Sequence, residues 1–167
     1  MSVRKVLVLP DPALQHVTHP IKNIGPDEVA LARDLVDTMQ ASPACVGLAA
    51  NQIGIERQAF CIDVTGHKKA DSCNGLVVLF NPELILAQHY ELGREGCMSV
   101  PDLTGNVSRA IEVVVRGITP EGIEREIEAN AIEARAILHE LDHLAGKVFL
   151  DRVQSFAADV FKRKRYR

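Results

Sequence analysis

One predicted helix constrains this chain more than any other segment, because it combines an almost wholly apolar surface with several ionisable side chains. The helix is expected to start at Asn130, which with Glu133 resembles a capping box, and to end at Gly146. A helix that is apolar nearly all round is normally buried. Its ionisable residues are His139, Glu140, Asp142 and His143. Because unpaired buried charges are costly, these side chains are expected to be paired or to bind a metal ion.

The spacing of these side chains indicates a metal site. His139 and His143 form an H-E-x-x-H segment, in which an α-helix places both imidazoles on one face, one turn apart. Glu140 lies on a neighbouring face, where it can reach a metal-bound water as a general base without ligating the metal. The alternative is a pair of ordinary core or surface histidines, and the apolar helix disfavours it.

A catalytic metal usually has three protein ligands, so a third must come from elsewhere. No H-x-x-G-x-x-H continuation follows His143, and the upstream candidate is Cys97, within the segment from Glu95 to Pro101. A metal would stabilise the Cys97 thiolate at neutral pH. The four cysteines show no repeated C-x-x-C spacing, so we expect reduced thiols rather than a disulfide framework or a zinc ribbon.

The segment from Gly47 to Gly54 contains small residues that allow close backbone packing, followed by Gln52, whose amide could donate to a ligand. Taken alone, this segment predicts a glycine-flanked turn more readily than a site. It lacks the G-K-[ST] of a phosphate-binding loop.

The remaining pattern predicts an α+β fold, with antiparallel β-sheets packed around a central buried helix that carries the H-E-x-x-H motif. A first helix is expected after Gly25 and before Pro43, and a C-terminal helix from about Val153. The expected strands cover residues 59–64, 76–80, 84–86, 111–115, 123–127 and 148–150. With 167 residues and no linker or repeat, we expect residues 1–167 to form a single catalytic domain.

Charge and hydropathy say little about partners. The formal net charge of −3 does not by itself predict a DNA or membrane partner. Residues 162–167 carry five positive charges, which fit either a solvated terminus or a short arm for an anionic partner such as ribosomal RNA. The apolar run at residues 6–9 is too short for a signal peptide or a spanning helix, so we expect a cytoplasmic protein.

Three segments together resemble the peptide deformylase family. Its motifs G-x-G-x-A-A-x-Q, E-G-C-x-S and H-E-x-D-H correspond, in the same order, to Cys45–Gln52, Glu95–Ser99 and His139–His143. Residues 9–12 and 146–152 are also similar to this family. The resemblance therefore covers nearly the whole chain, and three motifs jointly are far more specific than one.

The resemblance implies an enzyme that removes the formyl group from the N-terminal formyl-methionine of nascent polypeptides and releases formate. It implies that Cys97, His139 and His143 bind one divalent metal ion and that Glu140 is the general base and then the acid. Gln52 and the backbone N–H of Met98 would stabilise the oxyanion. The implied physiological metal is Fe²⁺, with Zn²⁺, Ni²⁺ or Co²⁺ able to occupy the site.

Two positions depart from the family pattern. Cys45 stands where the family has glycine, and could narrow the substrate groove or restrict φ. Leu138 stands where glutamine is usual, which could remove a hydrogen bond near the metal. Asp142 is expected to be a buried structural partner of a nearby charge, with Arg109 as a candidate.

Two other functions stay open on the sequence. One is a metallopeptidase of broader specificity, which shares H-E-x-x-H but would cleave unformylated peptides. The other is a non-catalytic, deformylase-like metal-binding protein, which the presence of Glu140 and Gln52 disfavours.

Overall fold

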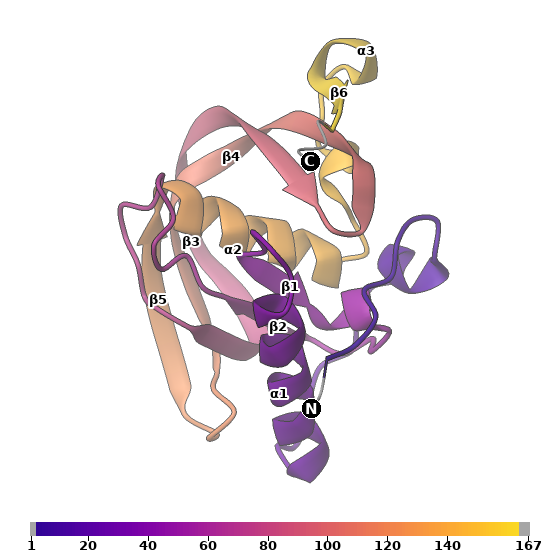
Figure 1. Cartoon of the computed structure of the whole chain (residues 1–167). Coiled ribbons are helices and arrows are strands. Elements are labelled where there is room, and N and C mark those ends of the chain that lie inside the picture. The colour runs from indigo at the N-terminus through magenta and orange to yellow at the C-terminus, as the bar shows by residue number, and fades with distance from the viewer. Residues whose placement is uncertain (1–2, 164–167) are drawn as a thin grey trace.

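A curled antiparallel sheet forms most of the computed structural model, which describes residues 3–163 (Figure 1). Five strands of the described chain are hydrogen-bonded in sequence order, and a sixth pairs with β4. The strands are β1 (Gly47–Ala49), β2 (Ala59–Ile62), β3 (Val77–Cys97), β4 (Val100–Ile118), β5 (Glu124–Asn130) and β6 (Val160–Lys162). This agrees with the prediction of a mixed α and β fold with an antiparallel sheet.

The hairpin of β3 and β4 is the part of the sheet that curls over the helix α2 (Ala131–Leu144) (Figure 1). Only Met98 and Ser99 connect the two strands, since Cys97 already pairs with Val100. Register shifts near Phe80 and beyond it bend the long strands, as β-bulges do. The tight connection fixes the position of Cys97 at the tip of the hairpin.

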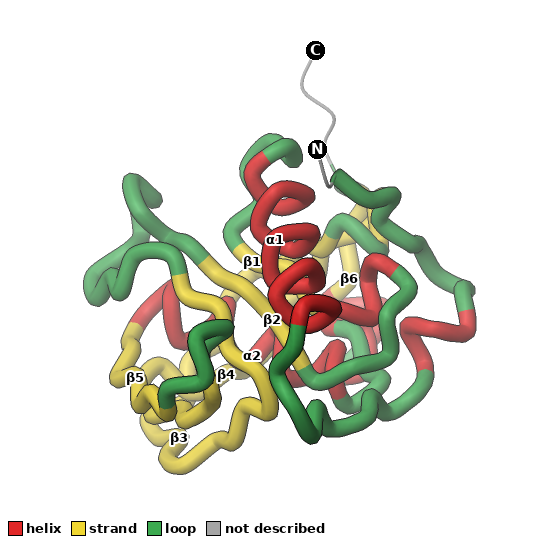
Figure 2. Tube along the Cα trace, turned by 90° about the horizontal axis from the view of Figure 1, so that it is seen from below, coloured by secondary structure: helices red, strands yellow, loops and turns green. Residues whose placement is uncertain are grey.

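The first helix, α1 (Pro26–Gln40), agrees with the prediction and lies beside β1 and β2 (Figure 2). Its N-terminus is preceded by Gly25, whose backbone N–H donates to the Glu28 carboxylate at 2.8 Å. Leu31, Leu35 and Met39 are buried on the face toward the sheet. This packing holds β1 in place beside β2.

The second helix, α2 (Ala131–Leu144), packs against β1, β2, β4 and β5. Ala134 and Ile137 are fully buried in the largest apolar cluster, together with Phe60 and Leu79. The helix ends as expected, with Gly146 in a left-handed conformation at φ 76°. Its burial agrees with its apolar pattern.

The predicted capping box at the start of α2 is wrong. Asn130 stands at the N-cap position but makes no side-chain cap, because its Oδ1 accepts from the backbone N–H of Ser72 at 2.8 Å. The Glu133 carboxylate also turns away, and accepts from Ser72 Oγ and from the backbone N–H of Asn74. Both side chains therefore anchor the loop before β3 instead of the helix end.

The C-terminal region differs most from expectation. The predicted strand at residues 148–150 is a 3-10 turn (Phe149–Asp151), because the Asp151 carboxylate accepts from the Val148 N–H at 2.9 Å. The predicted C-terminal helix is reduced to four residues, α3 (Phe156–Asp159). The chain then pairs as β6 with residues 103–105 of β4, so the sheet satisfies backbone groups that a longer helix would have satisfied.

Two further differences concern the strands. β3 merges the expected strands at residues 76–80 and 84–86 and continues to Cys97. Gly47–Ala49, expected as part of a turn, is strand β1 paired with β2. Within residues 3–163, no helix is long and apolar enough to cross a membrane.

Candidate active site

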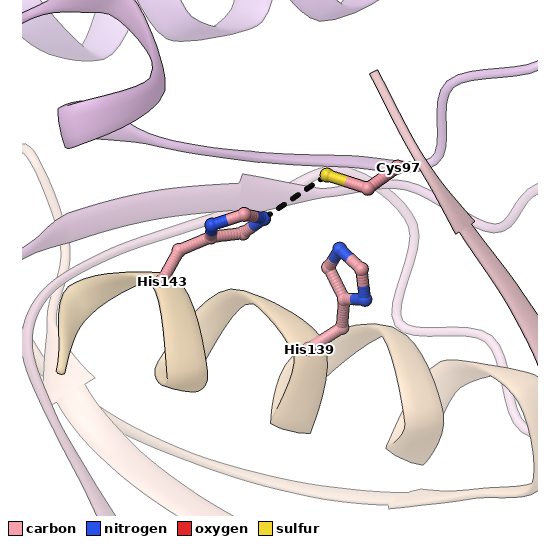
Figure 3. A group of neighbouring side chains, drawn as sticks. All are labelled: Cys97, His139 and His143. Atoms are coloured by element: carbon pink, nitrogen blue, oxygen red, sulfur yellow. Dashed lines mark hydrogen bonds between the residues drawn. The ribbon is translucent and has the colours of Figure 1, made fainter. Parts of the chain in front are cut away.

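The β3–β4 hairpin and α2 bring three potential metal ligands together (Figure 3). The ligand atoms of Cys97, His139 and His143 all lie within 4.8 Å of one another. The Cys97 Sγ atom is 3.2 Å from Nε2 of His143, although the two residues are 46 positions apart in the chain. The spatial grouping predicted for these residues is therefore present.

The donor set and its surroundings fit a metal ion. One sulfur and two imidazole nitrogens are the ligands that zinc and related divalent ions prefer, and three protein ligands leave a position for a further ligand. Burial lowers the pKa of His143 well below its usual range, which keeps this imidazole in the neutral form that ligates metals. His143 Nδ1 is buried without a hydrogen-bond partner in the described chain.

Glu95 orients the first histidine of the motif. Its Oε1 accepts from Nδ1 of His139 at 2.8 Å, which leaves the other ring nitrogen for a metal. Arg109 donates to both carboxylate oxygens, at 2.9 and 3.0 Å, and Arg135 donates to Oε2 at 2.8 Å. Burial alone would raise the pKa of Glu95, but the hydrogen bonds from His139 and Arg109 outweigh it and lower the pKa to about 2.

Burial opposes a proton on His139, yet hydrogen bonds to Cys97 and Glu95 raise the pKa of this imidazole well above its usual range. The surroundings of His139 thus favour positive charge beside the Cys97 sulfur. A bound divalent cation would supply that charge, and this is a second respect in which the residues fit a metal.

Glu140 follows His139 on α2 and is 3% exposed. Burial raises the pKa of its carboxyl to about 7, and Oε1 has no hydrogen-bond partner in the described chain. The carboxyl lies directly against Gly47 of β1, where a Cβ atom would come within 2.7 Å of Oε2. The Glu140 carboxyl is therefore buried, and its pKa lies near neutral pH.

Gln52 approaches the group from the 3-10 turn (Ala50–Ile53) that follows β1. Its Nε2 donates to Ser99 Oγ at 3.0 Å and lies 3.6 Å from Cys97 Sγ, while its Oε1 accepts from the Ala49 N–H at 2.9 Å. These contacts fix the amide with its N–H groups toward the tip of the hairpin. The segment that the sequence favours as a turn thus contributes to the site.

These residues border one cavity of about 310 Å³. Its walls come from the segment before and within β1, from the tip of the β3–β4 hairpin, and from α2. Residues of the predicted site that line it are Gln52, Cys97, Met98, His139 and Glu140. A small substrate can therefore reach Cys97, His139 and the Glu140 carboxyl together, while His143 is fully buried behind them.

Asp142 has the structural surroundings expected of it. Its Oδ2 accepts from Arg109 Nη1 at 2.5 Å, and Arg152 donates to both of its oxygens, at 2.8 and 3.1 Å. Burial would raise the pKa of Asp142, but the hydrogen bonds from Arg152 and the charge of Arg109 lower it. Arg109 therefore joins Asp142 to Glu95, and through Glu95 to His139.

Sequence reasoning missed several residues that support the ligands. Glu95 was recognised only as part of a motif, and Arg135 and Arg152 were not singled out. Asn51 was also missed: its Nδ2 donates to the backbone carbonyl of His143 at 2.5 Å. The charged residues on an otherwise apolar helix were the one available signal for such partners.

The two departures from the family pattern have simple structural settings. Cys45 lines the cavity, and its Sγ donates to the Gly47 carbonyl at 3.1 Å. Its φ is not positive, so the backbone there does not require glycine. Leu138 packs against the main core and lines a different cavity, together with Arg109 and Asp142.

Comparison with known proteins decides the family. The model of the polypeptide deformylase family matches residues 3–159. The chain belongs to the peptide deformylase family. The peptide deformylase of Syntrophobacter fumaroxidans is 38% identical over 98% of this chain and 94% of its own length. That of Carboxydothermus hydrogenoformans is 41% identical over 93% of this chain and 96% of its own.

Solved deformylase structures have the same fold. A peptide deformylase from Legionella pneumophila superposes with a TM-score of 0.84 and 34% identity, covering 92% of this chain and 88% of its own. One from Ehrlichia chaffeensis in complex with actinonin gives 0.87 and 29%, covering 94% and 92%. The family establishes the activity: this chain is an enzyme that removes the N-formyl group from nascent peptides in a metal-dependent reaction.

Proposed function

We propose that Cys97, His139 and His143 hold the metal ion of this deformylase and that Glu140 is its general base. The observation that carries this proposal is the meeting of three ligand atoms within 4.8 Å, beside a cavity that Cys97, His139 and Glu140 line. In this account α2, with its H-E-x-x-H sequence, is the central metal-binding helix of one catalytic domain spanning residues 1–167.

A metal ion held by Cys97, His139 and His143 would acidify a water molecule and polarise the formyl oxygen. Glu140 accepts the proton of the attacking water as the new bond to the formyl carbon forms. It then gives this proton to the methionine nitrogen as the bond between that nitrogen and the formyl carbon breaks, so the products are formate and a free N-terminus. A carboxyl with a pKa near neutrality suits both steps, since it accepts and releases a proton at comparable cost.

Gln52 and the backbone N–H of Met98 receive the negative charge that develops on the formyl oxygen. The side-chain amide of Gln52 is supported because its contacts to Ala49 and Ser99 fix its direction before substrate binds. A fixed donor of this kind typically contributes about 2.7–4 kcal/mol to transition-state stabilisation. Met98 is supported by its place at the tip of the hairpin, lining the same cavity.

We further infer from the family resemblance that Fe²⁺ is the physiological ion. Zn²⁺, Ni²⁺ or Co²⁺ can substitute in this proposal, because a thiolate and two imidazoles suit all four ions. The substrate is a nascent chain with an N-terminal formyl-methionine, and we infer that the enzyme acts in the cytoplasm. Contact of the basic tail with the ribosome remains a proposal: Lys162 and Arg163 are described, but residues 164–167 lie outside the described chain.

The test uses one anaerobically purified sample for metal analysis and for formate release. We expect one divalent ion per chain, and formate from formyl-Met-Ala-Ser but no cleavage of Met-Ala-Ser. Cleavage of the unformylated peptide would favour the metallopeptidase instead. Glu140→Ala should retain the metal and lose formate release, and unchanged turnover in this variant would rule out the proposed base.

A further inference from the structure

The C-terminal strand places an arginine at the active-site cavity. β6 pairs with β4 and ends at Lys162, and the backbone N–H of Arg163 then donates to the Asp102 carbonyl at 2.9 Å. The Arg163 side chain turns back over the hairpin, and its Nη2 donates to the backbone carbonyl of Cys97 at 3.3 Å. Its guanidinium lies directly against Gly96, where a Cβ atom would collide with it.

A second arginine, Arg94 of β3, lines the same cavity as Arg163. Arg94 donates from Nε to Asn106 Oδ1 at 3.0 Å and from Nη1 to Thr104 Oγ1 at 3.4 Å. Its guanidinium carbon lies 3.8 Å from the ring centroid of Phe161 in β6. These contacts hold Arg94 in one direction, but every partner is neutral, so its charge is not compensated.

The described partners of Arg163 are also neutral, so its charge is not compensated either. Both arginines line the cavity that Cys97 and His139 line. Within residues 3–163, no carboxylate lies within ion-pair distance of either guanidinium. Arg135, which lines the same cavity, differs because it is paired with Glu95 at 2.8 Å. One edge of the cavity therefore carries two ordered positive charges without a described counter-charge.

We propose that Arg163 and Arg94 form a basic rim that selects formylated peptides with an aspartate or glutamate at the second residue. The inference rests on the proposed function, which places the formyl group at Cys97, His139 and His143. Each residue of an extended peptide spans about 3.3–3.6 Å, so the next two residues reach roughly 7 Å beyond the methionine. Arg163, which touches the Cys97 carbonyl, lies within that reach.

Charge complementarity distinguishes selection of acidic peptides by the rim from simple obstruction of the cavity by the Arg163 side chain. A substrate carboxylate would supply the counter-charge that the rim lacks, while a lysine at the same position would be repelled. Arg163 could instead act as a strap that obstructs the cavity for every substrate. The two roles differ in a measurable ratio, because a strap cannot distinguish Asp from Lys.

The experiment compares kcat/KM for three formylated tripeptide amides: formyl-Met-Ala-Ser, formyl-Met-Asp-Ser and formyl-Met-Lys-Ser. Amidation removes the terminal carboxylate, so only the second residue changes charge. We expect the wild-type enzyme to favour Asp over Lys by about twofold to fivefold, the range of a partly exposed charge pair. Arg163→Ala and Arg94→Ala should each lower this ratio, and Arg163→Glu should reverse it.

Arg33→Ala is the matched control, since it removes one positive charge from the exposed face of α1, and its ratio should equal that of the wild type. The affinities of the three deformylated products for each protein give a second readout that does not depend on turnover. Equal values for Asp and Lys in the wild type would overturn the rim while leaving the proposed function intact.

A rise of all three kcat/KM values by one factor in Arg163→Ala would also overturn the rim and identify a strap. No formate from any peptide would contradict the proposed function. The affinities of the deformylated products would then be the only test of whether the rim prefers Asp over Lys. A preference for Asp that Arg163→Ala and Arg94→Ala diminish, with Arg33→Ala unchanged, supports it.

Discussion

The Glu95 carboxylate lies 2.8 Å from Nδ1 of His139 and is itself held by Arg109 and Arg135. Glu95→Gln should therefore loosen His139, because a neutral amide receives the imidazole N–H more weakly and leaves the two arginines partly unpaired. Changes of this kind typically cost about 10- to 100-fold in metal affinity. Metal content after titration with a chelator measures the loss.

Glu91→Gln is the matched control for that experiment. Glu91 is exposed on the same strand, so the change removes one carboxylate without touching His139. Equal metal retention by the two variants would show that Glu95 does not position the histidine.

The close approach of β1 to Glu140 predicts a defect from one added methyl group. In Gly47→Ala the new Cβ would come within 2.7 Å of Glu140 Oε2, so the carboxyl must move. We expect kcat for formyl-Met-Ala-Ser to fall by about tenfold or more, since a general base acts only within hydrogen-bond reach of its proton. Metal content should stay unchanged, because no ligand is touched. Full turnover in this variant would mean that the Glu140 position is not critical.

The ion pairs of Asp142 predict a stability effect rather than a chemical one. Asp142→Asn removes the negative charge between Arg109 and Arg152. Because Arg109 keeps its ion pair with Glu95, we expect a loss of up to about 3 kcal/mol in the free energy of unfolding, the lower end for a broken buried pair. Denaturant unfolding should show the loss, together with lower folding yield or metal retention. If the purified, metal-replete variant were fully stable and defective only in turnover, Asp142 would instead belong to the catalytic machinery.

The three cysteines outside the proposed metal site, Cys45, Cys61 and Cys73, should differ sharply in their reactivity toward iodoacetamide. Burial raises the pKa of Cys45 from 9.0 to about 11 and that of Cys61 well above its usual range, while Cys73 is exposed. Because the thiolate is the nucleophile, iodoacetamide at pH 8 should label Cys73 first. Labelling of Cys45 should increase only as the pH approaches 11. Peptide mapping by mass spectrometry would reveal early labelling of Cys45, which would contradict its burial.

The local parts of the site follow from the sequence because they depend on helix geometry alone. A spacing of four residues places His139 and His143 on one face, and adjacency places Glu140 beside them, whatever the helix packs against. The apolar circumference of the same segment predicts burial, and its four ionisable residues predict partners. The family motifs add Cys97 and Gln52, which lie far from the helix in the chain.

Tertiary structure alone decides which partners those residues meet. Glu95 of β3 and Arg109 of β4 meet beside His139 because the bends and register of these two strands bring them there, and no local periodicity encodes that register. The C-terminal residues form β6 rather than a longer helix because the edge of β4 offers backbone partners. That pairing puts Arg163 at the cavity, a long-range contact that depends on the whole sheet being in place.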